Sequence, residues 1–388
     1  MPFALPHIVA GFIAVMVGYT SSVILIIQAA TAAGADAAQV SSWLWTLGIG
    51  MGISCIGLSL YYRIPVLTAW STPGAALLIT SLGDFTLAEA IGAFIISSLL
   101  ITLCGISGWF DRLMRHIPAP LAAAMLAGVL LRFGLDLFKV APQDPLLLGS
   151  LLLAFLLGRH LWPRYTMVLV LMSGIAICAL RGDLQLGGVH WQLATPVWIS
   201  PTFSLDALLG VALPLFIVTM TSQNMPGITI LRAHGYQPAT SSLISWTGLT
   251  GLLLAPFGGY AFNLAAITAA ICMGKEVDPD ANRRWPAAVW AGCFYLLTGC
   301  FGATVAALFT AFPATLITCV AGLALLGTIG SSLHTALQHD EAREAALLTF
   351  IITASGISLL GVGAACWGLL IGFGLHLLQS RPRGRAKQ

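Results

Sequence analysis

The chain has 388 residues, of which 58% are hydrophobic and only 8% are Lys, Arg, Asp or Glu. Soluble globular proteins carry roughly 25% charged residues, because exposed apolar area must be rimmed by polar side chains. The composition therefore excludes a soluble enzyme and a secreted module. A formal net charge of only +3 also excludes a nucleic-acid-binding domain. The chain is expected to be an all-α polytopic membrane protein.

A transmembrane helix needs about 20 mainly apolar residues. Cutting the sequence at charges, prolines and glycine clusters predicts fourteen such spans. They lie at 6–30, 40–60, 66–82, 86–108, 118–138, 145–161, 164–181, 203–231, 238–256, 258–273, 286–310, 312–335, 343–361 and 363–379.

Basic residues set the expected orientation of these spans. With fourteen spans both termini lie on one side of the membrane, and fourteen of the 17 Lys and Arg residues fall on that side. They include those of the basic tail at 381–388, whereas Arg132, Lys139 and Arg181 fall on the other side. Because cytoplasmic loops are enriched in Lys and Arg, both termini are predicted to be cytoplasmic.

The long external loop at 182–202 divides the chain into repeats at 1–181 and 203–380. Seven spans in each repeat give the two repeats opposite orientations, as in inverted-repeat transporters. Weak internal similarity supports this division. Residues 17–22 align with 218–223, and the Pro-Ala pairs at 118–119 and 313–314 begin equivalent spans.

Two spans at equivalent places in the repeats contain helix-breaking signals. In span 66–82, Thr72 followed by Pro73 is typical of an N-cap and first helical residue. In span 258–273, two glycines precede Asn263, another good N-cap residue. Both are predicted to be an extended segment followed by a half-helix. The alternative is that Pro73 makes a simple kink and Gly258-Gly259 a tight loop between helices.

Half-helices that begin inside the membrane would present N–H groups and positive dipole ends, which favour an anionic ligand. Polar residues inside apolar spans are costly and often functional. The densest such group, 219–224, precedes Pro226. It is predicted to face the half-helices, although hydrogen bonding between helices would also explain it. Tyr19, Trp70, Tyr260 and Phe262 could flank a flat substrate, or could simply face lipid or the core.

Three segments carry a family resemblance: TAWSTPGAAL at 68–77, SQNMPG at 222–227 and FNLAAITAAI at 262–271. They resemble the benzoate/proton symporter family of the BenE type, which is distantly similar to nucleobase–cation and sulfate transporters. The resemblance covers nearly the whole chain. It implies a core domain (about 6–108 and 203–310) and a gate domain (about 118–181 and 312–379). It also implies an elevator-like movement of the core and a homodimer through the gate domain.

The resemblance implies a carrier in the bacterial cytoplasmic membrane that imports benzoate or a similar aromatic carboxylate with protons. Helix starts would offer backbone N–H groups to the carboxylate, polar side chains of the eighth span would add donors, and aromatic rings would contact the substrate ring. The residues predicted to bind substrate are Tyr19, Thr72, Gly74, Ser222, Gln223, Asn224, Phe262, Asn263 and Leu264.

One departure from the distant relatives concerns protons. Nucleobase transporters similar to this chain have glutamates in spans 8 and 10, where this chain has Gln223 and Phe262. A neutral site suits a carboxylate, which a glutamate would repel, but it removes the obvious proton carrier. Asp84 and Asp206 are the remaining candidates for proton coupling. Their alternative role is that of solvated charges at helix ends.

Other functions remain open on the sequence alone. The same fold could carry a nucleobase or an inorganic anion, and facing helix dipoles could also build an anion channel. A membrane enzyme or a receptor is a further alternative, but no HExxH, GxSxG or P-loop pattern occurs and the eight cysteines stand singly. We therefore expect no catalytic residue, cofactor, metal or nucleic-acid partner. The expected partners are the substrate, protons, membrane lipid and a second copy of the chain.

Overall fold

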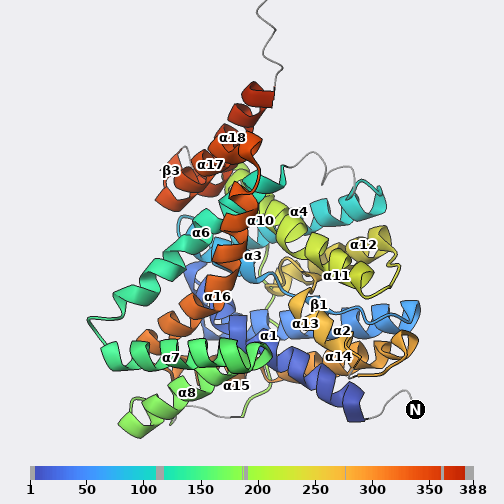
Figure 1. Ribbon diagram of the computed structural model, residues 1–388, viewed down its shortest axis with the longest axis vertical. Helices are drawn as coiled ribbons and strands as arrows, with labels where there is room; N and C mark the ends of the chain where they lie inside the picture. Colours follow the sequence, from blue (N-terminus) through green and yellow to red (C-terminus); the bar gives the residue numbers. More distant parts are fainter. Residues whose placement is uncertain are drawn as a thin grey trace, which may run out of the picture.

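The computed structural model describes residues 5–110, 118–185, 187, 191–275, 277–359 and 362–380 and consists almost entirely of helices (Figure 1). The predicted tail at 381–388, together with Arg112 and Arg115, lies outside these residues. The first half contains α1 (Leu5–Ala32), α2 (Ala37–Tyr62), β1 (Thr68–Ala69), α3 (Thr72–Ser81), α4 (Leu87–Ile106), α6 (Ala119–Lys139), α7 (Pro145–Leu161), η1 (Pro163–Tyr165) and α8 (Thr166–Arg181).

The second half begins with one long helix that contains two π-helical turns. Each turn ends two residues before a proline, Pro214 or Pro226, whose missing N–H cannot continue the α-helical pattern. The elements are α9 (Leu205–Ala207), η3 (Leu208–Ala212), α10 (Leu213–Thr219), η4 (Met220–Asn224), α11 (Met225–Ala233), α12 (Thr240–Leu254), η5 (Ala255–Phe257), β2 (Asn263–Leu264), α13 (Ile267–Cys272), η6 (Ala281–Arg283), α14 (Trp285–Cys300), α15 (Gly302–Thr310), α16 (Ala314–Leu337), η7 (Asp340–Ala342), α17 (Arg343–Ser355), β3 (Ser358–Leu359), β4 (Val362–Gly363) and α18 (Ala364–Ser380).

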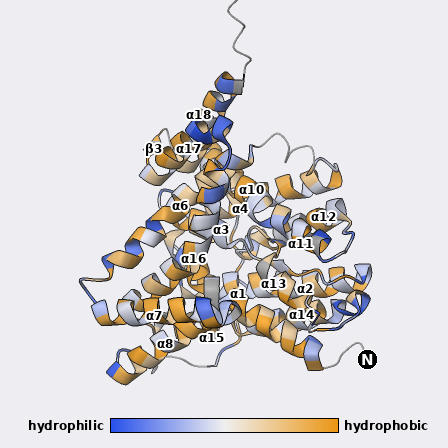
Figure 2. Cartoon of the chain, viewed as in Figure 1, coloured by the Kyte–Doolittle hydropathy of each residue, from blue (hydrophilic) through white to orange (hydrophobic). Residues whose placement is uncertain are grey.

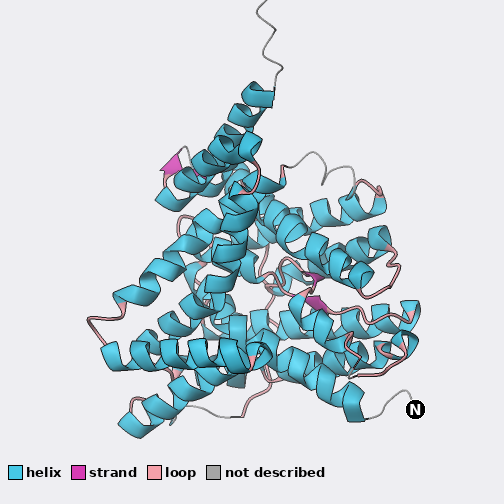
Figure 3. Cartoon of the chain, in the orientation of Figure 1, coloured by secondary structure: helices cyan, strands magenta, loops and turns pink. Residues whose placement is uncertain are grey.

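A short antiparallel pair of strands joins the two halves near the centre of the molecule (Figure 3). In β1 and β2, Thr68 lies opposite Leu264 and Ala69 opposite Asn263. Each strand precedes a short helix, α3 or α13. The backbone order at both places is thus an extended segment followed by a helix.

Two predicted spans differ from the helices that form. The segment at 286–310 is not one straight helix, since α14 and α15 meet at a bend of 69°. The segment at 343–361 is helical only to Ser355, because Gly356 takes a left-handed conformation with φ of 65° and ends α17. A two-stranded hairpin of β3 and β4 then leads into α18.

Helices of the two halves pack against each other in related pairs. Helix α2 packs along α14, and α4 packs along α12. Helix α6 lies against both α16 and α17, while α16 also contacts α7. If the second half repeats the first, α12 corresponds to α2 and α14 corresponds to α4. The contact between α2 and α14 is then equivalent to the contact between α12 and α4.

Hydrophobic residues predominate along most of the helices (Figure 2), and many large ones are exposed. Leu153, Leu156 and Leu157 of α7 are exposed, as is Leu253 of α12. Among the described residues, five helices are each long and apolar enough to cross a membrane, or seven if two bent pairs each count as one span. Helices α7, α8 and α18 are shorter apolar helices. The chain is therefore a multi-pass membrane protein.

The segment between the halves lies in extended form across the helices that it connects. The Val197 N–H donates to Ser42 Oγ at 2.9 Å, and the Ile199 N–H donates to the Pro256 carbonyl at 2.8 Å. The Thr202 N–H donates to the Ala88 carbonyl at 3.0 Å. The segment thus ties α2, η5 and α4 together.

Candidate functional site

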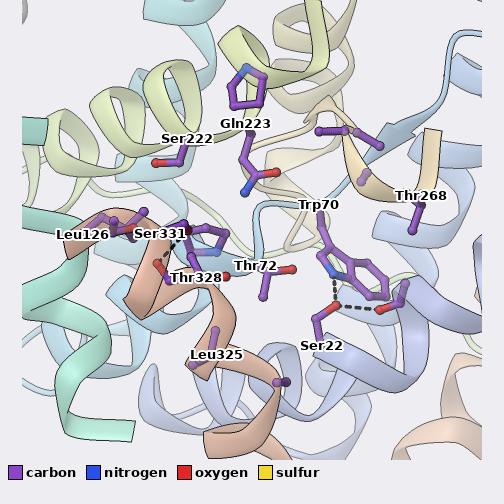
Figure 4. A pocket seen from close by; sticks show the side chains of 18 of the residues that line it. Ser22, Trp70, Thr72, Leu126, Ser222, Gln223, Thr268, Leu325, Thr328 and Ser331 are labelled. Carbon is purple, nitrogen blue, oxygen red and sulfur yellow. Dashed lines mark hydrogen bonds between the residues drawn. The ribbon is translucent and has the colours of Figure 1, made fainter. Parts of the chain in front are cut away.

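A cavity of about 860 Å³ lies between elements of both halves, within the size range of small-molecule sites. The described residues that line it belong to α1, α2, β1, α3, η4, α11, α13 and α14, to the segments that lead into α3 and α13, and to α6, η1, α8 and α16. In the terms of the predicted domains, the cavity lies between core and gate. Figure 4 shows polar groups projecting into it from both sides.

Three of the predicted site residues line this cavity: Thr72, Ser222 and Gln223. Ser222 and Gln223 belong to the π-helical turn η4, where the Met225 N–H donates to the Met220 carbonyl five residues earlier. Figure 4 shows the carboxamide of Gln223 extending into the cavity, with Thr72 and Trp70 on the opposite side. Ser222 and Gln223 are both half-buried, so their polar groups are available to a ligand.

Aromatic side chains form one wall of the cavity. Trp70 and Tyr295 line it, and the Tyr19 ring packs edge-on against Trp70 with ring centroids 4.8 Å apart. Trp70 Nε1 donates to Ser22 Oγ at 2.8 Å, which fixes the orientation of the indole. Tyr19 therefore supports the wall from behind. Tyr295 was not predicted from the sequence, since one tyrosine in an apolar helix gives no distinctive signal.

Helix α16 supplies hydroxyl groups from the opposite side. Thr328, Ser331, Ser332 and Thr335 all line the cavity. Their spacing of three and four residues places them on one face of a helix. This polar stripe is visible in the sequence but lies far along the chain from the helix breaks, so it was not among the predicted residues.

The helix caps differ from those predicted. The N-cap of α3 is Ser71 rather than Thr72, and Ser71 Oγ accepts the Gly74 N–H at 3.0 Å. This N–H is therefore already bonded within the helix start. Asn263 caps no helix, because it lies in β2 and α13 begins only after Ala266. Gly74 and Asn263 are not among the lining residues.

Three other predicted residues lie behind the cavity surface. Asn224 is fully buried, and its Oδ1 accepts the Leu264 N–H at 3.0 Å, so both groups already have a partner. Phe262 is also buried, and its ring lies so close to Gly50 that a side chain there would meet it at 2.4 Å. These residues hold η4, β2 and α2 together.

The two predicted proton carriers lie away from the cavity. Asp84 is exposed in the turn before α4, and Asp206 is exposed in the short helix α9. None of the described side chains that line the cavity carries a charge at neutral pH. Among the described residues, no group of three or more His, Cys, Asp or Glu is placed to hold a metal ion.

Solved structures share this fold at low sequence identity. The transmembrane domain of the cyanobacterial bicarbonate transporter BicA matches with a TM-score of 0.59 and 11% identity, covering 96% of this chain and 99% of that one. SLC26A9 matches with a TM-score of 0.58 and 12% identity, and here the chain spans 65% of the matched protein. Identities this low establish the fold alone.

Sequence comparison finds relatives of higher identity than these structures. The family model for the benzoate membrane transport protein, BenE, matches residues 1–378. Inner membrane protein YdcO of Escherichia coli (strain K12) is 52% identical over 367 residues, which cover 95% of this chain and 94% of that one. The benzoate membrane transport protein of Acinetobacter baylyi is 39% identical over 381 residues, with 98% and 97% covered. The family is named for transport, not for an enzymatic activity, and the chain belongs to this BenE family of benzoate membrane transport proteins.

Proposed function

We propose that the protein is a secondary transporter that imports benzoate or a similar aromatic carboxylate across the bacterial cytoplasmic membrane. The cavity between the two groups of helices is the observation that carries this proposal. It combines an aromatic wall at Trp70 and Tyr295 with polar groups of Thr72, Ser222 and Gln223. An aromatic acid has the same two parts, a flat apolar ring and a polar carboxyl group.

Within this proposal, Ser222, Gln223 and Thr72 contact the carboxyl group, while Trp70 and Tyr295 contact the ring. The other predicted residues act by holding these groups in place. Asn224 and Leu264 fix η4 against β2, and Tyr19 fixes the indole of Trp70. Gly74, Phe262 and Asn263 have the same supporting role in α3 and β2.

The proposed mechanism is alternating access by an elevator-like shift of the core domain against the gate domain. The reciprocal contacts of α2 with α14 and of α4 with α12 support an inverted repeat of seven plus seven spans. In this arrangement β1 with α3, and β2 with α13, are the two broken spans. A homodimer would form through the gate domain.

The orientation of the cavity follows from the positive-inside rule. The lining residues Ala119 and Thr166 begin helices that follow predicted cytoplasmic loops, and Thr335 lies near the end of a helix that enters another. If both termini lie in the cytoplasm, as proposed, the cavity would open to the cytoplasmic side. Transport is proposed to be proton symport; Asp84 and Asp206, the carriers predicted from the sequence, are exposed and are not among the residues that line the cavity.

Equilibrium binding to the purified protein tests the proposal, because neutral benzoic acid crosses bilayers unaided and obscures uptake. Calorimetric titration with benzoate, uracil, sulfate and bicarbonate would compare the open alternatives. Saturable binding of benzoate alone is the expected result. Binding of uracil or an inorganic anion instead would retain the fold and reject the substrate. Currents far above carrier turnover in planar bilayers would indicate an anion channel.

A further inference from the structure

We propose that the substrate occupies this cavity as the neutral carboxylic acid, so that the transported proton is bound to the substrate's own carboxyl group. This inference rests on the proposed function and adds the protonation state of the ligand. It follows from the direction of the hydrogen bonds that the cavity hydroxyl groups make.

Several hydroxyl groups of the cavity already donate their hydrogens to backbone carbonyls. Thr221 Oγ1 donates to the Ile217 carbonyl at 2.7 Å, and Ser22 Oγ donates to the Gly18 carbonyl at 2.8 Å. On α16, Ser331 Oγ donates to the Thr328 carbonyl and Thr335 Oγ1 to the Ser331 carbonyl, both at 3.1 Å. Such groups retain lone pairs, so they present acceptors to the cavity.

A carboxylate has only acceptors, whereas a protonated carboxyl group has one acceptor and one O–H donor. The Gln223 carboxamide can donate to the carbonyl oxygen of the acid. The O–H of the acid can then donate to a hydroxyl oxygen of the cavity, such as Thr221 Oγ1, which lies in the same π-helical turn as Gln223. A carboxylate could accept from the Gln223 amide and from the hydroxyls of Thr72 and Ser222, but it would face the lone pairs of the back-bonded Thr221 oxygen. An acid matches both kinds of group, because it can accept from the donors and donate to that oxygen.

Electrostatics favours the same form. The described lining side chains are uncharged, and transfer of an unpaired carboxylate out of water raises its pKa. Tyr295 is the titratable side chain that faces the ligand. Among the described side chains, the lining elements carry further charged or histidine ones, all outside the lining set: His7 on α1, Arg132, Asp136 and Lys139 on α6, Arg181 on α8, Arg232 on α11 and His334 on α16. The protonated acid should therefore bind in this cavity more tightly than the carboxylate.

The proton balance of this cycle is simple. The carboxylate takes one proton from external water as it enters the cavity, and the acid returns that proton to water on the cytoplasmic side. No bond to the protein forms or breaks, and no protein group changes its charge. One proton and one carboxylate cross together, so the transported unit is electrically neutral.

The test is equilibrium binding of para-substituted benzoates of differing acidity to the purified full-length protein across a pH series. For each acid, the apparent Kd should be constant below its own pKa and rise about tenfold for each pH unit above it. The pH at which the apparent Kd begins to rise, which we call the break, should therefore differ between two acids by the difference in their pKa values. Benzamide, which is always neutral, should bind independently of pH, and benzenesulfonate, which is always ionised, should not bind.

Other outcomes would overturn the inference. A break at the same pH for every acid would show that a protein group titrates, and binding of benzenesulfonate as tightly as benzoate would show that the anion is bound. If no benzoate binds to the folded protein at any pH, the proposed function itself fails.

A pair of threonine variants adds a second readout. Thr221→Val should weaken benzoate and benzamide binding several-fold without moving the break in pH. Thr250→Val removes a similarly back-bonded hydroxyl of a half-buried residue on α12, outside the cavity lining, and should change neither. Equal effects of the two substitutions would contradict a role for the Thr221 acceptor.

Discussion

Gln223 and Asn224 are adjacent polar residues with different tasks. Gln223 is half-buried and extends into the cavity (Figure 4), whereas Asn224 is fully buried and bonded to the Leu264 N–H. The π-helical turn that contains them changes the angular spacing of side chains along this helix. One amide can therefore meet a ligand while its neighbour fixes the turn to β2.

Replacing Gln223 tests the ligand contact. The Gln223→Ala protein should fold normally and bind benzoate more weakly by about 1–3 kcal/mol, the cost of leaving a buried hydrogen-bond partner unpaired. Calorimetric titration of the purified variant measures this difference. Gln237→Ala, an exposed glutamine in the loop before α12, is the matched control and should leave affinity unchanged. Unchanged affinity in Gln223→Ala would remove this residue from the site.

Replacing Asn224 tests a structural contact. The Asn224→Ala change leaves the buried Leu264 N–H without its acceptor, which should destabilise the protein by about 1–3 kcal/mol. A thermal unfolding curve in detergent should therefore show a lower Tm. Asn282→Ala, in the exposed turn η6, serves as the control. A Tm equal to that of the unchanged protein would show that the bond to β2 contributes little.

Between helices, glycine allows α2 and α14 to approach closely. A Cβ atom at Gly48 would lie 2.5 Å from Gly299 Cα, a contact with backbone that side-chain rotation cannot relieve. Small residues commonly allow such approaches between membrane helices. The contact is central, because α14 also carries Tyr295 into the cavity.

This packing gives a matched pair of alanine variants on one helix. Gly48→Ala should destabilise the protein by about 1–3 kcal/mol, as expected for overpacking. Gly57→Ala meets nothing within 4 Å and should be neutral or stabilising, because alanine favours helix. Thermal unfolding of the two variants side by side provides the measurement. Similar Tm values for both would show that the helices can separate without cost.

Some local features of these elements could be predicted from the sequence and others could not. An extended segment precedes a short helix near Pro73 and after the Gly258-Gly259 pair, while the prediction that these are two broken membrane spans stays a prediction. The cap at Ser71 was missed by one residue, because Ser and Thr stand side by side and either hydroxyl can cap. Asn263 was misassigned because its conformation depends on pairing with Ala69, a contact across the whole length of the first repeat.

At the scale of the molecule, the membrane class was predictable from the composition, and the family was predictable from three sequence motifs. The cavity between helices of the two halves was not predictable, since the hydroxyl stripe of α16 meets the other lining elements only in the folded chain. Of the nine predicted binding residues, Thr72, Ser222 and Gln223 lie on that cavity. The other six are close in the sequence to lining residues. Sequence spacing alone cannot distinguish a residue that lines the cavity from one that packs behind it.

The predicted orientation can be tested with fusions. Green fluorescent protein attached after Gln388 should fluoresce, because the C-terminus is predicted to be cytoplasmic. Alkaline phosphatase fused after Leu184, in the predicted external loop, should be active, since this enzyme folds only outside the cytoplasm. The opposite pattern for both fusions would invert the topology and with it the direction in which the cavity faces.

The strand pair also sets a condition on biosynthesis. Thr68 pairs with Leu264, so 196 further residues must be synthesised after β1 before its partner strand exists. At about 5–20 residues per second this takes roughly 10–40 s. During that interval β1 has an unpaired edge inside or beside the bilayer, where unbonded backbone groups are costly. The pairing of β1 and the cavity lined by both halves of the chain are therefore completed only late in translation.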